Sequence, residues 1–184
     1  MNLNNITACL LTKEDTYPQV ILDNVNNYPF KEVLIGTHSP SPYMKHELFK
    51  RVKTKYIFYC DDDAIVPIDK LLEKSKPNII NVGMKSGHYE AYQSSRATMG
   101  LGWGAIFPKS LLESLTKYTD KYGYDSVYQR ETERIFTYLN YPQNRIVLDI
   151  TDLPSAYAED RLWRQADHEL FKELAISRCR SLVL

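Results

Sequence analysis

Short apolar runs alternate with amphipathic or charged stretches along the first half of the chain. The runs at residues 6–12, 32–37 and 56–60 have the length and the residue types of strands. Residues 18–30 carry apolar side chains at near-helical spacing, and the charged stretch 45–53 is also typical of a helix. Strands that alternate with helices predict a mostly parallel sheet flanked by helices, so we expect the α/β class and a Rossmann-like domain.

The second half continues this alternation with more punctuation by glycine and proline. We expect a helix at 68–76, a strand at 78–84, a second strand at 88–94 that pairs with it as a hairpin, a strand after the glycine-rich segment 100–104, a helix opened by Pro108, an amphipathic helix at 125–139, a last strand at 145–150 and a helical tail from about 160.

The length, the charge balance and the cysteines of the chain exclude some classes of function but do not identify one. The 184 residues suit one domain, and 23 basic residues balance 23 acidic ones, so no overall field attracts nucleic acid or an anionic membrane. Cys9, Cys60 and Cys179 are far apart, which favours buried thiols in a reducing compartment. No segment approaches the roughly 20 apolar residues of a membrane span, and we expect a cytoplasmic protein.

Three consecutive acids follow the most strand-like run, "YIFYC". If the strand geometry persists, Asp61 and Asp63 point to one face and Asp62 points to the other. Two carboxylates in one small volume repel each other unless a cation supplies positive charge. Because ligands of open α/β sheets bind beyond the carboxyl ends of strands, this pattern indicates a metal and phosphate site. The alternative is a solvated polar turn that ends the strand.

The order of elements up to "KYIFYCDDDAIVP" resembles the nucleotide-sugar-binding half of GT-A glycosyltransferases, especially the large inverting family with an acidic D-x-D element. "GWGAIFPKSLL", "YDSVYQRETERIF" and "DRLWRQADH" are similar to that family's acceptor-side strand, base-bearing helix and C-terminal loop, so the resemblance covers about residues 5–170. It implies a single GT-A domain with a donor half at 1–83, an acceptor side at 84–150 and a tail at 151–184 that folds back on the donor.

The resemblance also implies roles for the acids and a metal. Asp61 would meet the sugar or ribose and share the metal with Asp63, while Asp62 either supports a neighbour or faces solvent. Thr12 would meet the nucleoside by its position after the first strand. His168 would complete the metal coordination, and an imidazole ligand favours Mn²⁺ over Mg²⁺.

Further candidates each have a structural alternative. Arg161 and Arg164 would contact the diphosphate, because a guanidinium offers paired donors, or would lie on a solvated helix face. Gly102 and Gly104 flank Trp103 and let the backbone approach closely, so Gly102 and Trp103 would contact a sugar on which Trp103 stacks; the alternative is that Trp103 belongs to the core.

An inverting transfer needs a carboxylate that takes the proton of the acceptor hydroxyl. The candidates are Asp125, Glu131 and Glu133. Glu131 and Glu133 lie two residues apart on a helix and diverge, so at most one faces the cleft. We favour Glu131, because Glu133 has basic neighbours to pair with; the alternative is that all three are surface acids.

The sequence therefore predicts a metal-dependent transfer of a sugar from a nucleoside diphosphate donor, with a UDP-sugar favoured, to an acceptor hydroxyl that stays open. A homo-oligomer is compatible with this chain. Competing hypotheses are a nucleotidyltransferase, disfavoured because "LLTKEDTYPQ" has no glycine, a phosphohydrolase or nuclease that would use His38, and a silent nucleotide-sugar-binding module. A base that faces the metal would distinguish the transferase from the silent module.

Overall fold

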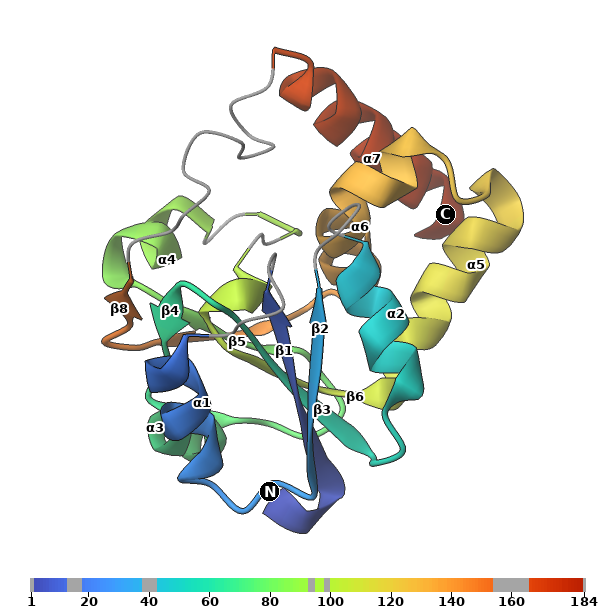
Figure 1. Ribbon diagram of the computed structural model, residues 1–184. Helices are drawn as coiled ribbons and strands as arrows, with labels where there is room; N and C mark the ends of the chain where they lie inside the picture. Colours follow the sequence, from blue (N-terminus) through green and yellow to red (C-terminus); the bar gives the residue numbers. More distant parts are fainter. Residues whose placement is uncertain are drawn as a thin grey trace.

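A six-stranded sheet forms the centre of the computed structural model, which describes residues 2–12, 18–37, 43–92, 95–97, 100–153 and 166–183 (Figure 1). The strand order is β2-β1-β3-β6-β5-β7, and only β6 runs opposite to its neighbours. The strands are β1 Ile6–Thr12, β2 Glu32–Thr37, β3 Tyr56–Asp61, β5 Asn81–Met84, β6 Ala105–Pro108 and β7 Asn144–Val147. The α/β class and the mostly parallel sheet are confirmed.

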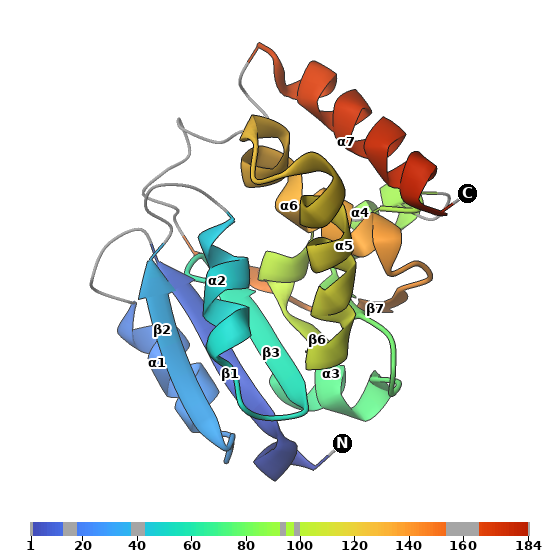
Figure 2. The ribbon, with the colours of Figure 1, turned by 90° about the vertical axis from the view of Figure 1, so that its right-hand side faces the viewer.

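Helices cover both faces of the sheet (Figure 2). One face packs against α1 Gln19–Asn26 and α3 Ile68–Lys74. The other packs against α2 Met44–Arg51, α5 Glu113–Tyr122 and α6 Ser126–Leu139, and α7 His168–Val183 lies along α6. Short 3₁₀ helices lie at Leu3–Asn5 (η1), Leu101–Trp103 (η2) and Lys109–Leu112 (η3).

The strand that carries the acids is central and buried on both faces. Side chains alternate along β3, so Ile57 and Tyr59 enter the core beneath α2 and α6, while Phe58 and Cys60 enter the core beneath α1 and α3. All four are at most 1% exposed. Because both faces of β3 are buried, its sequence is continuously apolar. Asp61 is the last residue of this strand.

The second strand predicted at 88–94 is not formed by residues 88–92, the part of it that the structure describes. Residues 86–92 form the helix α4 Ser86–Tyr92. Tyr89 and Tyr92 are three residues apart, which is a helical spacing, and Tyr89 packs against the core beneath α2 and α6. The strand β5 therefore pairs with β6 and β7 and not with a strand formed by these residues.

A second, two-stranded sheet was not predicted. It pairs β4 Ala64–Ile65, just after the acids, with β8 Thr151–Asp152, which follows the last strand of the main sheet. The predicted last strand at 145–150 is thus divided between β7 and the approach to β8.

The thiols of Cys9, Cys60 and Cys179 are buried, as expected from their apolar surroundings. Burial raises the pKa of the Cys179 thiol to about 12, and it raises the pKa of the Cys9 thiol as well. Neither thiol is therefore an activated nucleophile. None of the described helices is long and apolar enough to cross a bilayer.

Candidate functional site

The candidate site lies at the edge of the sheet where β1 and β3 end. Thr12 ends β1 beside Asp61, because Leu11 and Asp61 are paired in the register of these strands. The reversed strand β6 starts at the same edge, so η2, with Gly102 and Trp103, lies beside the end of β3 (Figure 1). The structure thus brings together the acids, Thr12 and the glycine-rich segment, three predicted parts of one site.

Asp61 is held in place by its neighbours. Its Oδ1 accepts a hydrogen bond from the Tyr59 hydroxyl. Its other oxygen lies directly over Gly102, and a Cβ atom at position 102 would overlap this carboxylate. Glycine is therefore required at position 102 to let Asp61 occupy this place, which gives Gly102 a role other than the predicted contact with a sugar.

Asp62 and Asp63 form the turn between β3 and β4. The backbone N–H of Leu153 donates to the carbonyl of Asp63 at 2.7 Å, directly after β8. All three acids are half-buried, in contrast to the fully buried strand before them. The small sheet of β4 and β8 therefore fixes the turn that carries the second and third acids.

A buried lysine that the sequence analysis did not single out faces Asp61. The side chain of Lys45 on α2 is 6% exposed, and its Nζ lies 2.8 Å from Glu133 Oε2 and 5.1 Å from the centroid of the Tyr59 ring. Burial lowers the pKa of Lys45, but attraction by Glu133 and Asp61 outweighs it and leaves the pKa above the ordinary value. Lys45 is a fixed cation beside the acids.

Glu133 reaches this edge of the sheet from α6. Besides the ion pair with Lys45, its Oε1 accepts a hydrogen bond from the backbone N–H of Leu101 at 3.0 Å. Leu101 belongs to η2 and immediately precedes Gly102. We refer to Tyr59, Asp61, Lys45, Gly102 and Glu133 as the acid-edge cluster.

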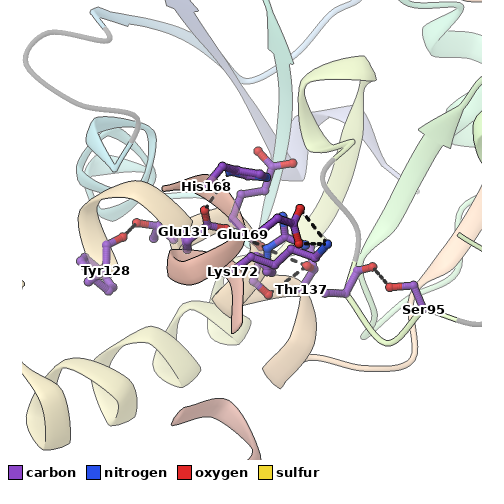
Figure 3. A network of polar contacts seen from close by, with 11 residues as sticks. Ser95, Tyr128, Glu131, Thr137, His168, Glu169 and Lys172 are labelled. Atoms are coloured by element: carbon purple, nitrogen blue, oxygen red, sulfur yellow. Dashed lines mark hydrogen bonds and ion pairs between the residues drawn. The ribbon is translucent and has the colours of Figure 1, made fainter. Parts of the chain in front are cut away.

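Glu131 lies beside His168 of α7, as Figure 3 shows. Its side chain is 1% exposed, its Oε2 accepts from Arg134 Nε at 2.8 Å, and its Oε1 is 3.6 Å from Nδ1 of His168 on α7. The backbone of α6 leaves the helical conformation at Glu131, with φ −110° and ψ 17°. Glu131 and Glu133 diverge as expected, and Glu133 is the one that reaches Lys45 and η2 at the edge of the sheet.

Asp125 caps the N-terminus of α6. Its Oδ1 accepts from the backbone N–H of Tyr128 at 3.0 Å, and its Oδ2 accepts from Arg178 on α7 at 2.7 Å. Asp125 thus connects α6 with α7. All three candidate bases are engaged with other protein groups in this structure.

The structure does not bring the predicted metal ligands together as a set. Among the described residues, no group of three or more histidines, cysteines or acids is arranged to hold a metal ion. His168 lies against Glu131. Asp61 and Asp63 offer carboxylate oxygens, which fit a Mg²⁺- or Mn²⁺-like cation that takes its remaining ligands from phosphate and water. Arg161 and Arg164 lie outside the described residues, as does His38.

Trp103 is half-buried at the rim of the site. Its ring meets His88 of α4 edge-on, with centroids 4.4 Å apart, and Lys85 lies 5.4 Å from its centroid. Lys85 directly follows β5 and pairs with Asp152 of β8. The edge of the sheet therefore carries a second cation, and this one is partly exposed.

Comparison with known proteins adds no assignment to this geometry: no family model matches the chain, and no curated protein matches it.

Proposed function

We propose that the protein is a glycosyltransferase of the GT-A type that binds a nucleoside diphosphate sugar at the acid-edge cluster and transfers the sugar to an acceptor hydroxyl with inversion. The observation that carries this proposal is the position of Asp61. A carboxylate at the end of a central strand, fixed by Tyr59 and admitted only by a glycine, differs from a solvated turn.

The topology supports a donor site at this place. Ligands of open α/β sheets lie beyond the carboxyl ends of the strands. The reversed strand β6 adds the glycine-rich η2 to that edge, where Gly102 lets the backbone approach the Asp61 carboxylate closely. A nucleoside would lie toward Thr12 and the sugar toward Trp103, because these residues flank Asp61 on its two sides in the strand order.

Asp61 and Asp63 are the residues that would hold a divalent cation, with Mn²⁺ or Mg²⁺ compatible with their oxygens. Such a cation would neutralise charge that develops on the departing diphosphate. Lys45 and Lys85, which pair with Glu133 and Asp152, lie at the same edge. Both lysines belong to the described part of the chain, whereas the predicted diphosphate contacts Arg161 and Arg164 lie outside it.

Glu133 is the proposed base. The acceptor oxygen attacks the anomeric carbon, the bond from that carbon to the diphosphate oxygen breaks with its electron pair, and the hydroxyl proton passes to the Glu133 carboxylate. The Lys45 ammonium, 2.8 Å from this carboxylate, holds it at the edge of the sheet. Asp125 and Glu131 instead connect α6 with α7.

A second candidate function is a nucleotide-sugar-binding module without turnover. It is favoured by the observation that both oxygens of Glu133 are already engaged, one with Lys45 and one with Leu101. On this hypothesis the acid-edge cluster binds the donor, and Glu133 only positions η2.

Calorimetric titration of UDP and GDP, with and without Mn²⁺, tests the donor site. We expect metal-dependent binding of one nucleotide that Asp63→Ala abolishes and that Asp120→Ala, a change of an exposed acid on α5, leaves intact. Equal nucleotide binding by both variants, or no metal-dependent binding by the natural chain, would mean that the three acids form only a structural turn.

Donor turnover then separates the two functions. Slow hydrolysis of the bound UDP- or GDP-sugar is expected of a transferase, and Glu133→Gln should lose this turnover while it retains metal-dependent nucleotide binding. Binding without turnover in the natural chain would favour the silent module. Turnover that survives in Glu133→Gln would remove Glu133 from the role of base.

A further inference from the structure

The helix α7 is the outermost element on its side of the molecule (Figure 2). Its inner side carries the buried Ala175 and Cys179, and Phe171, Ile176 and Leu182 pack against the same core. These apolar contacts attach α7 to the rest of the protein. The attachment therefore uses one side of the helix and leaves the opposite side available.

The outer side of α7 carries two leucines that the core does not use. Leu170 is 58% exposed and Leu174 is 39% exposed. The exposed Ser177 and Ser181 continue the same row, because intervals of four, three and four residues return to one side of an α-helix. We call Leu170, Leu174, Ser177 and Ser181 the outer row. Its spacing is that of the contact positions of a helix pair.

Two charged side chains border the outer row. Glu173 and Arg180 are exposed, and neither has an ion-pair partner among the residues that the structure describes. They lie two helical turns apart, about 10 Å along the axis, so they do not pair with each other. Arg178, in contrast, is already bound to Asp125. The outer side of α7 thus presents one free acid and one free base.

The outer row is complementary to itself when two copies of α7 run antiparallel. Leu170 then lies opposite the partner's Ser181, and Leu174 lies opposite the partner's Ser177, so that each large side chain meets a small one. The Ser181 hydroxyl donates to the Arg178 carbonyl at 2.9 Å, so a leucine can cover it without leaving it unpaired.

The charges match in the same arrangement. In an antiparallel helix pair, the positions that precede the contact row on each helix face each other across the interface. Glu173 therefore lies beside the partner's Arg180, and the two-fold axis repeats the pair with the copies exchanged. Both free charges of α7 find a partner of opposite sign.

A parallel arrangement matches less of this pattern. It would set each leucine against the same leucine and each serine against the same serine. Glu173 would meet the partner's Arg178, a residue that Asp125 already holds at 2.7 Å, and Arg180 would stay unpaired. The charge pattern therefore selects the antiparallel orientation.

We propose that the outer row of α7 is the interface of a homodimer, in which α7 of a second copy packs antiparallel across it and Glu173 pairs with the partner's Arg180. The row offers few apolar side chains, so the interface belongs to the small, transient class, and the dimer should form between about 10 and 500 µM protein. This proposal does not depend on the proposed transfer reaction.

The test is sedimentation velocity of the natural chain, Glu173→Arg, Arg180→Glu and an equimolar mixture of the two variants. The mass of the natural chain should rise with concentration from one copy toward two. Each variant alone sets like charges against each other twice and should stay monomeric over the same range. The mixture restores both pairs of opposite charge, so it should form dimers again.

Glu73→Arg is the matched control, because Glu73 is an exposed acid on α3, on the opposite face of the sheet. It should dimerise like the natural chain. Circular dichroism should show the same helix content and closely similar unfolding in all variants, since the changed side chains are exposed. A natural chain that is monomeric at every concentration would overturn the proposal, as would a dimer that survives either reversal at α7. A mixture that stays monomeric would overturn the antiparallel pairing.

Discussion

Two carboxylates on α6, only two residues apart, belong to two different regions of the molecule. Glu133 joins the acid-edge cluster, where its partners come from α2 and η2 and the neighbouring acid comes from β3. Glu131 lies between α6 and α7, where its partners are Arg134, one turn away on the same helix, and His168. The first region joins distant parts of the chain, and the second holds one helix against the next.

The difference teaches that burial and pairing alone do not identify a functional acid. Glu131 is buried, the Glu133 side chain is 11% exposed, and each is paired with a basic residue, but only the acid-edge cluster lies at the end of parallel strands beside half-buried acids. In the region between α6 and α7, the ionic contacts account for the acids as structural groups. Location at the sheet edge is what makes Glu133 the better candidate.

The largest expected effect comes from the buried pair of the acid-edge cluster. Lys45→Met should reduce the free energy of unfolding by about 3–5 kcal/mol, because it leaves the Glu133 carboxylate, whose side chain is 11% exposed, without its counter-charge. Denaturant unfolding monitored by circular dichroism measures this change.

The matched control is the double variant Lys45→Met with Glu133→Gln. The neutral amide keeps an oxygen that can accept from Leu101, so the double variant should be more stable than Lys45→Met alone. If Glu133→Gln instead lowers the free energy of unfolding further, Lys45 does not act by balancing the charge of Glu133. The two regions would then differ less than their geometry implies.

Gly102→Ala should have the next largest effect. The new methyl group would overlap the Asp61 carboxylate, so the cost of overpacking should be about 1–3 kcal/mol. Displacement of Asp61 should also abolish metal-dependent nucleotide binding. Unfolding and calorimetry on the same preparation measure both consequences.

Gly87→Ala is the control for this change. Gly87 lies on α4, and a Cβ there would meet no atom within 4 Å. Alanine in a helix is favoured over glycine by roughly 0.5–1 kcal/mol, so this variant should be as stable as the natural chain or more so. A Gly102→Ala protein that matches Gly87→Ala in stability and binding would show that Asp61 need not lie over position 102.

The sequence was sufficient to predict the position of the acids. A continuous apolar run followed by three aspartates indicates a strand buried on both faces, and β3 has that burial from Tyr56 to Cys60. The divergence of Glu131 and Glu133 also follows from helical geometry. Which of the two reaches the sheet edge depends on how α6 packs, and periodicity along one helix carries no information about its neighbours.

Other features depended on contacts between distant segments. Lys45 lies four residues before Phe49, on the same buried side of α2, but a lysine in a charged helix usually indicates a solvated face. Its burial requires Glu133, which is 88 residues later. The two-residue strands β4 and β8 are likewise too short for any local pattern, and only their pairing defines them.

The smallest expected effect tests the region between α6 and α7. Asp125→Ala removes the N-cap of α6, which should cost about 1 kcal/mol, and the partly exposed pair with Arg178, which should add less than about 1 kcal/mol. Asp125→Asn retains a good cap and removes only the charge, so it should cost less than the alanine variant in denaturant unfolding. Equal losses in the two variants would assign the effect to the ion pair rather than the cap.

Since Asp125 belongs to the structural region, nucleotide binding should be unchanged in both variants. A loss of binding would mean that the packing of α7 against α6 affects the acid-edge cluster and that the two regions are coupled.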